Sequence, residues 1–195
     1  PCMSSKIWLS KPHFENDDGD FFKKTIESNW ISTVGPHIGD FEKSIEKFYH
    51  NKVHVAALNS GTSAIHLALK MLDIGAGDEV ICQSMTFAAS ANPITYLGAK
   101  PIFIDVDIDT MGLSPDALKN FLNEFGEKRE DGTFNKLTGK RIAACMPMHT
   151  FGFIVRMAHQ RYGECLHAIP FVTHEHDDRQ VHGSTRKNIC TIDRS

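Results

Sequence analysis

The sequence predicts an α/β domain whose mostly parallel sheet is flanked by helices. Apolar runs typical of strands alternate along the chain with stretches whose apolar residues have helical spacing. Strands separated by helices usually run parallel, because each helix returns the chain to the same end of the sheet. The composition, with 41% hydrophobic and 23% charged residues, is that of a globular protein with enough apolar residues for a core.

The expected elements begin near residue 40. Apolar runs predict strands at residues 52–58, 78–84, 100–107 and 141–148, and helical spacing predicts helices at residues 40–50, 61–72, 86–99 and 113–125. Asp40 is placed to cap the first helix, and Ser114 with Pro115 marks the start of the last. The helix that follows residue 60 is apolar on several sides, so we expect it to be largely buried. Residues 126–140 are polar and rich in turn formers, which predicts a surface excursion.

Charge and targeting signals narrow the classes of partner. The net charge of -3 gives no electrostatic reason to expect nucleic acid or an anionic membrane. No apolar run approaches the roughly 20 residues of a membrane span, and the N-terminal stretch lacks the apolar core of a secretory signal. We therefore expect a cytoplasmic protein. The five scattered cysteines are expected to be buried free thiols: Cys2, Cys82, Cys145, Cys165 and Cys190.

A loop of small polar residues, 59–63, precedes the second helix. Its sequence, NSGTS, would place unpaired backbone N–H groups and the positive end of the helix dipole against an anion. The chain has neither the dinucleotide-binding pattern GxGxxG nor the nucleotide pattern GxxxxGK[ST] here. Three hydroxyls and one glycine suit a single terminal phosphate. The alternative is an ordinary Ser/Thr-rich helix cap without a ligand.

The next strand leads into the sequence QSMTFAASAN, which places Thr86 and Phe87 at the same sheet edge as the NSGTS loop. An aromatic side chain there could lie flat against a planar ring whose phosphate is held by the loop. Core packing is the alternative role for Phe87.

Three motifs in order, NSGTSAIHLAL, GDEVICQSMTFAASANPITYLGAKPIFIDVD and PMHTFG, resemble the sugar aminotransferases of the DegT/DnrJ/EryC1/StrS family. The resemblance covers residues 5–157. It implies pyridoxal 5'-phosphate as cofactor and the incomplete large domain of the pyridoxal-phosphate-dependent transferase fold type I. Residues 113–152 also resemble the subgroup that acts on UDP- or GDP-linked 4-keto-6-deoxy amino sugars on the way to bacillosamine- or legionaminic-type sugars. The amino donor is glutamate by resemblance, and family members are homodimers whose sites draw residues from both subunits.

The resemblance also assigns site residues. It implies that Gly61, Thr62 and Ser63 hold the cofactor phosphate and that Phe87 stacks on the pyridine ring. His149 matches the family's histidine beside the active site, although a histidine that ends a buried strand can also be hydrogen-bonded core. Trp30, Ile31 and Ser32 would line the sugar-nucleotide side, with surface packing as the alternative. No metal site is expected within these motifs.

The sequence departs from the family pattern after HTFG. The acidic residue facing the pyridine nitrogen is expected soon after IPFV, where Asp177 aligns and Glu175 and Asp178 are rivals. The family's Schiff-base lysine is expected beyond Ser195, because Lys187 comes too early. We therefore expect a substrate-side segment (1–35), a partial cofactor-binding domain (36–157) and a divergent tail (158–195), without the small C-terminal domain and without a catalytic lysine.

Two other functions remain open. The chain could be a non-catalytic fragment that binds pyridoxal phosphate or a nucleotide sugar, or a metal-binding module through its histidine-rich tail. The tail's potential ligands are Cys165, His167, His174, His176, Asp177, Asp178 and His182, but no pair has the spacing of a known zinc motif. In either case an interrupted sheet leaves an unpaired edge and exposed apolar faces. We therefore expect the chain to be poorly soluble or to need a partner.

Overall fold

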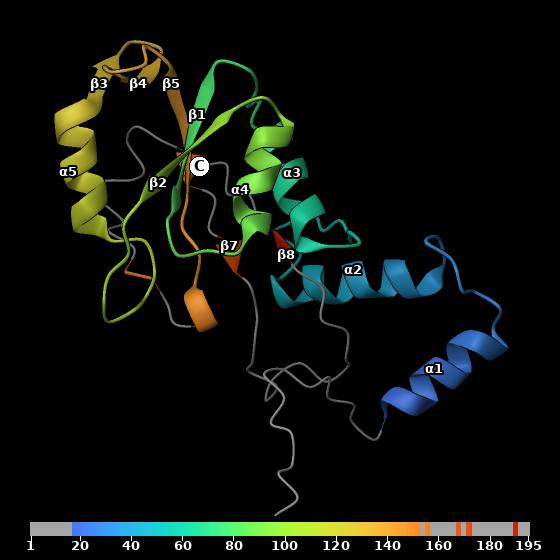
Figure 1. Cartoon of the computed structure of the whole chain (residues 1–195). Coiled ribbons are helices and arrows are strands. Elements are labelled where there is room, and N and C mark those ends of the chain that lie inside the picture. The colour runs from blue at the N-terminus through green and yellow to red at the C-terminus, as the bar shows by residue number, and fades with distance from the viewer. Residues whose placement is uncertain (1–16, 153–154, 157–166, 169–170, 173–188, 191–195) are drawn as a thin grey trace, which may run out of the picture.

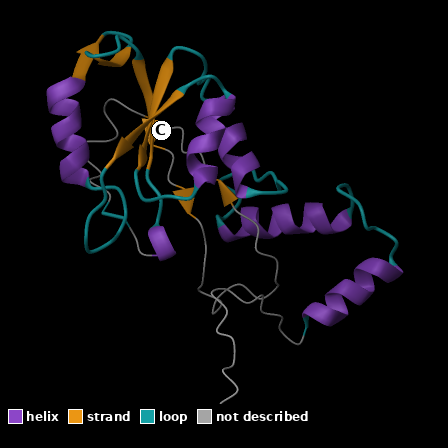
Figure 2. Ribbon diagram, viewed as in Figure 1, coloured by secondary structure: helices purple, strands orange, loops and turns teal. Residues whose placement is uncertain are grey.

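The computed structural model describes residues 17–152, 155–156, 167–168, 171–172 and 189–190. Its helices are α1 (Asp18–Glu27), α2 (Pro36–Phe48), α3 (Gly61–Met71), α4 (Ala88–Tyr96), α5 (Pro115–Phe125) and the short 3-10 helix η1 (Thr150–Gly152). Its strands are β1 (Asp78–Gln83), β2 (Lys100–Ile104), β3 (Gly126–Arg129), β4 (Gly132–Asn135), β5 (Arg141–Met146), β6 (His167–Ala168), β7 (Phe171–Val172) and β8 (Ile189–Cys190). The alternation of strands and helices confirms the predicted α/β class (Figures 1 and 2).

The main sheet is mixed and has the order β2-β1-β5-β4-β3, with β6 also paired to β5. The central strands β2, β1 and β5 are parallel, whereas β3 and β4 are antiparallel. β7 and β8 form a separate antiparallel pair. The parallel part of the sheet therefore matches the prediction, and the antiparallel part is new.

Each face of the sheet carries its own apolar core. On one face α3 and α4 cover Val80, Cys82 and Met146, with Ile65 and Ile94 among the buried side chains of the helices. On the other face α5 covers Ile81, Ile104 and Cys145 (Figure 1). Successive residues of β1 thus point to opposite cores, as a strand's period of two requires.

The two cysteines whose side chains are described are buried and free, as expected. Burial raises the pKa of the Cys82 and Cys145 thiols to about 12. Both therefore behave as small apolar core residues. The side chains of Cys2, Cys165 and Cys190 lie outside the described part of the chain.

Helix α3 is less buried than predicted. Its side chains at Ala64, Ile65, Ala68 and Leu69 are buried, but Leu67 and Met71 are exposed. The apolar residues of α3 therefore belong to two surfaces. One packs in the core, and the other is covered by nothing in the described part of the chain.

Helix α2 begins four residues before the predicted cap at Asp40. Gly35 takes the N-cap position with φ of 157°, and Pro36 occupies the first turn. A Cβ atom at Gly35 would lie 3.2 Å from the Trp30 ring, so glycine suits both the conformation and the packing. The prediction of Asp40 as N-cap is wrong because the glycine-proline pair starts the helix earlier.

Residues 52–58 do not form a strand, so that prediction is wrong for the described structure. The backbone N–H groups of Val55 and Ala57 instead donate to the carboxylates of Glu46 and Glu42 in α2, at 3.1 and 2.8 Å. These residues are two apart, as are residues that face one neighbour in a sheet. The apolar pattern of a strand is present, but no other strand of the described residues pairs with it.

The predicted surface excursion at 126–140 contains the hairpin of β3 and β4. Gly126 joins α5 directly to β3, and a Cβ atom there would lie 2.5 Å from the carbonyl oxygen of Leu122. In β4 the buried residues are Thr133 and Asn135, whose amide Nδ2 donates to Glu79 Oε2 at 2.8 Å. Polar side chains face inward, so the apolar alternation that identifies a strand is absent.

Candidate functional site

The candidate site lies at the carboxyl edge of the parallel strands. The N-terminal ends of α3 and α4 both lie at this edge, as does η1, which follows β5 (Figure 1). In α/β sheets this edge is where ligands bind, because the loops there connect strand ends to helix starts. This edge therefore brings together the NSGTS loop, Phe87 and His149.

The start of α3 is capped from within the loop. Ser60 is the N-cap, and its hydroxyl accepts a hydrogen bond from the backbone N–H of Ser63 at 3.2 Å. The Ser60 and Ser63 hydroxyl oxygens are 3.0 Å apart. Within the described part of the chain, the backbone N–H groups of Gly61 and Thr62 have no hydrogen-bond acceptor. These two groups and the helix dipole would favour an anion at this position.

Phe87 is the N-cap of α4 and its side chain is 79% exposed. This exposure contradicts core packing as its role. An aromatic ring so exposed at the edge where α3 begins offers an open face to a planar ligand.

Thr86 links the segment before Phe87 to the end of β5. Its hydroxyl lies 2.8 Å from the hydroxyl of Ser90 and 3.3 Å from the sulfur of Met148. No role for Thr86 was predicted from the sequence. A β-branched polar residue directly before the aromatic residue is the signal that could have indicated it.

His149 follows β5 and is half-buried. Its Nδ1 accepts a hydrogen bond from the backbone N–H of Val155 at 3.0 Å, so the neutral imidazole carries its proton on Nε2. This bond fixes the orientation of the ring. Two roles were considered for His149, a place beside the active site and a hydrogen-bonded position in the core. It is hydrogen-bonded, and it also lies at the candidate edge.

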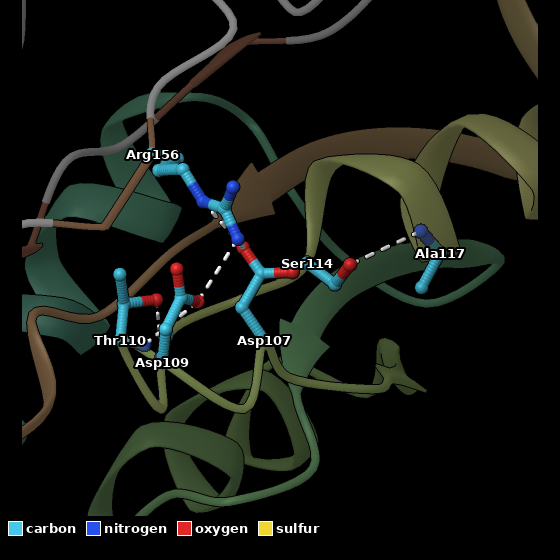
Figure 3. A network of polar contacts seen from close by, with 7 residues as sticks. Asp107, Asp109, Thr110, Ser114, Ala117 and Arg156 are labelled. Atoms are coloured by element: carbon cyan, nitrogen blue, oxygen red, sulfur yellow. Dashed lines mark hydrogen bonds and ion pairs between the residues drawn. The ribbon is translucent and has the colours of Figure 1, made fainter.

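The segment that carries His149 is fastened to the turn after β2. Arg156 pairs with Asp107 at 3.0 Å and with Asp109 at 2.9 Å, as Figure 3 shows. Val155 is buried against Gly112, where a Cβ atom would lie 2.8 Å from the Val155 side chain. Burial and paired charges together hold this segment in place.

Gln83, the last residue of β1, is 1% exposed and lies between these segments. Its Oε1 accepts hydrogen bonds from the backbone N–H groups of Leu113 and Met148, at 3.1 and 3.0 Å. Its Nε2 lies 2.9 Å from the Met85 carbonyl oxygen and 2.8 Å from the Thr150 hydroxyl. From the sequence, Gln83 was predicted only to be part of the strand at residues 78–84.

The substrate-side residues do not lie at this edge within one chain. Trp30, Ile31 and Ser32 are exposed and belong to the connection between α1 and α2. That connection lies at the end of α2 remote from the starts of α3 and α4 (Figure 1). Their assignment to a substrate remains a prediction.

The tail residues considered for the cofactor and for a metal lie outside the described chain or lack a described side chain. They are Cys165, His167, His174, Glu175, His176, Asp177, Asp178, His182 and Lys187. Among the described residues, no group of His, Cys, Asp and Glu side chains could hold a metal ion. No helix of that part of the chain is long and apolar enough to cross a membrane.

Sequence comparison finds relatives that match the predicted class. EpsN of Bacillus subtilis, assigned as a pyridoxal phosphate-dependent aminotransferase, is 43% identical over 134 residues, which are 69% of this chain and 34% of EpsN. The GDP-perosamine synthase of Caulobacter vibrioides is 38% identical over 152 residues, 78% of this chain and 36% of that enzyme. The chain thus spans about a third of the length of these relatives.

Comparison of folds gives the same group. The crystal structure of a DegT DnrJ EryC1 StrS aminotransferase from Brucella abortus matches with a TM-score of 0.63 and 26% identity, over 80% of this chain and 39% of that one. NtdA from Bacillus subtilis, solved with bound cofactor PMP, matches with a TM-score of 0.56 and 28% identity, over 71% of this chain and 28% of that one. The family profile matches residues 12–189, and the chain therefore belongs to the DegT/DnrJ/EryC1/StrS aminotransferase family.

Proposed function

We propose that the chain is the cofactor-binding part of a pyridoxal-phosphate-dependent aminotransferase that acts on a nucleotide-linked 4-keto-6-deoxy sugar. Such a reaction supplies amino sugars to a cell-surface polysaccharide or glycan, with glutamate as amino donor and in the cytoplasm. The family supports the reaction class, and the relative named as a GDP-perosamine synthase supports a sugar substrate.

The observation that carries the proposal is the pairing of two features at one sheet edge. Gly61 and Thr62 present backbone N–H groups at the start of α3, and Phe87 presents an open aromatic face at the start of α4. A phosphate on the first and a pyridine ring on the second would be the two parts of one molecule of pyridoxal phosphate. The bound cofactor would act as an electron sink for the substrate carbon.

The chain's own residues would position that cofactor. The N–H groups of Gly61 and Thr62, with the hydroxyls of Thr62 and Ser63, would hold the phosphate. Phe87 would stack on the ring, and His149 would lie beside it in a fixed orientation. Asp177 would supply the acidic partner of the pyridine nitrogen.

A homodimer is part of the proposal. Exposed apolar side chains line α1 and the connection that follows it, including Phe22, Ile26, Ile31 and Val34. No residue of α1 is buried. A second copy that covers this surface could bring Trp30, Ile31 and Ser32 to the partner's site.

The proposal also holds that the 195 residues alone do not complete transamination, because the resemblance places the Schiff-base lysine beyond them. Titration of the whole chain with pyridoxal phosphate, followed by absorbance, borohydride reduction and peptide mapping, tests this. We expect binding that inorganic phosphate competes away, with no adduct at a single lysine. Pyridoxal, which lacks the phosphate, is the control and should bind far more weakly.

Two results would count against the proposal. Equal binding of pyridoxal and pyridoxal phosphate would remove the phosphate position at α3. A stoichiometric adduct at one lysine would show that this chain has its own nucleophile, which would overturn the expected inactivity and leave the cofactor site standing.

A further inference from the structure

We propose that Gln83 is the positioning residue of the ring side of this site, an inference that rests on the proposed function. Gln83 ends β1 and contacts three segments that are far apart in the sequence. These are the segment that leads to Phe87, the turn that precedes α5, and the segment that carries His149.

The hydrogen bonds of Gln83 use the full capacity of its amide. Oε1 has two lone pairs and accepts from Leu113 and Met148, at 3.1 and 3.0 Å. Nε2 has two hydrogens, directed at the Met85 carbonyl at 2.9 Å and the Thr150 hydroxyl at 2.8 Å. The two backbone N–H groups on one side leave only one orientation of the amide that satisfies all four partners.

The same amide supports a strained turn. Met111 has a φ of 53°, an uncommon value for a residue other than glycine, and so does Phe151. The Met111 carbonyl accepts from the Thr150 hydroxyl at 2.8 Å and lies 3.3 Å from Gln83 Nε2. Gln83 and Thr150 therefore link the two segments at the places where these uncommon backbone conformations occur.

The positions of Phe87 and His149 follow from these contacts. Met85 is two residues before Phe87, and Met148 directly precedes His149. One buried side chain thus sets the distance between the aromatic face and the imidazole. Gln83 has no hydrogen bond to α3, so the phosphate position does not depend on it.

This difference separates a positioning role from a merely structural one. In Gln83→Leu the N–H groups of Leu113 and Met148 lose their acceptor, so both segments should relax while the start of α3 stays intact. We expect the dissociation constant of pyridoxamine phosphate to rise about tenfold and that of inorganic phosphate to change less than about twofold.

Asn135→Leu is the matched control. Asn135, in β4, makes a buried hydrogen bond to Glu79 near the start of β1, whereas Gln83 lies at the other end of β1. Loss of this bond should therefore destabilise the fold without changing the candidate edge. We expect this variant to lower the unfolding midpoint and to leave the ratio of the two dissociation constants unchanged. A Gln83→Leu variant that lost both ligands in parallel would reduce Gln83 to a structural residue and overturn the inference.

A second variant and a second readout keep the inference separate from the proposed function. Gln83→Glu keeps both acceptors but loses the donors to Met85 and Thr150. In amide hydrogen exchange on the free chain, we expect Gln83→Leu to expose residues 84–90, 111–114 and 147–151. Gln83→Glu should expose residues 84–90 and 149–151 and leave residues 111–114 protected. A wild-type chain that bound no pyridoxamine phosphate would refute the proposed function, and the exchange pattern would then decide the role of Gln83. Uniform exchange in both variants would refute that role.

Discussion

Phe87 is a single side chain that should matter for cofactor binding and hardly at all for stability. Its ring is exposed and makes little contribution to the core, so Phe87→Leu should leave the unfolding midpoint nearly unchanged. Loss of stacking on the pyridine ring should weaken pyridoxal phosphate binding by about threefold to tenfold.

The control for that variant is Phe103→Leu, which replaces another exposed phenylalanine on the edge strand β2. Fluorescence or absorbance titration of both variants gives the comparison. Equally weakened binding of pyridoxal phosphate in the two variants would show that the ring of Phe87 does not stack on the cofactor.

Asp78, the first residue of β1, makes the stability of the fold depend on pH. Arg141 donates to both of its carboxylate oxygens, at 2.9 and 3.0 Å, and the Gly75 N–H donates at 3.0 Å. Burial raises the pKa of Asp78, but these hydrogen bonds outweigh it and hold that pKa below its usual value. A lowered folded pKa gives stability that is present above about pH 4, the unfolded pKa, and lost as the pH falls through the folded value.

The pH dependence of Asp78→Asn tests this coupling. The difference in free energy of unfolding between wild type and variant should be constant above about pH 5 and shrink below about pH 4. Urea denaturation at each pH measures it. A difference in free energy that stayed constant down to pH 3 would mean that the contact with Arg141 does not lower the pKa of Asp78.

At the level of elements, two helix caps with the same chemistry should differ in function. Ser60 caps α3 and Ser114 caps α5, each through a bond from the N–H three residues on. Ser60→Ala and Ser114→Ala should each cost about 1 kcal/mol of stability. Only for Ser60→Ala should saturating phosphate offset the loss, because an anion at α3 supplies the missing acceptor. Thermal unfolding with and without phosphate gives both values, and an equal offset at Ser114 would argue against a site at α3.

The elements also show what the sequence could predict. β1, β5 and α5 were found close to their observed ends, because strong apolar patterns or a serine-proline start mark them. The β3–β4 hairpin was missed because Asn135 is buried for its bond to Glu79, which no apolar pattern reports. Helix α1 was missed because it buries no residue. At the site, the motifs indicated Gly61 and Phe87, whereas Gln83 could not be found because its partners Leu113 and Met148 lie 30 and 65 residues away.

At the level of the whole molecule, the apolar surface of α1 and the connection after it should drive association. Sedimentation velocity at rising concentration should show self-association of the wild-type chain. Ile26→Glu, on α1, should reduce it, because a charge in a covered apolar surface is costly. Ile108→Glu, at an exposed position after β2, is the control and should not. A wild-type chain that stayed monomeric at every concentration would contradict both the homodimer and the expected need for a partner.

Cofactor binding by this chain depends, in our proposal, on a phosphate held at the start of α3. The most direct test is an NMR titration of the amide signals with inorganic phosphate. We expect the signals of Gly61 and Thr62 to shift most, because their N–H groups have no acceptor within the described chain. The start of α5 at Ser114 should not respond. Shifts of similar size at both helices, or none at Gly61 and Thr62, would contradict the claim.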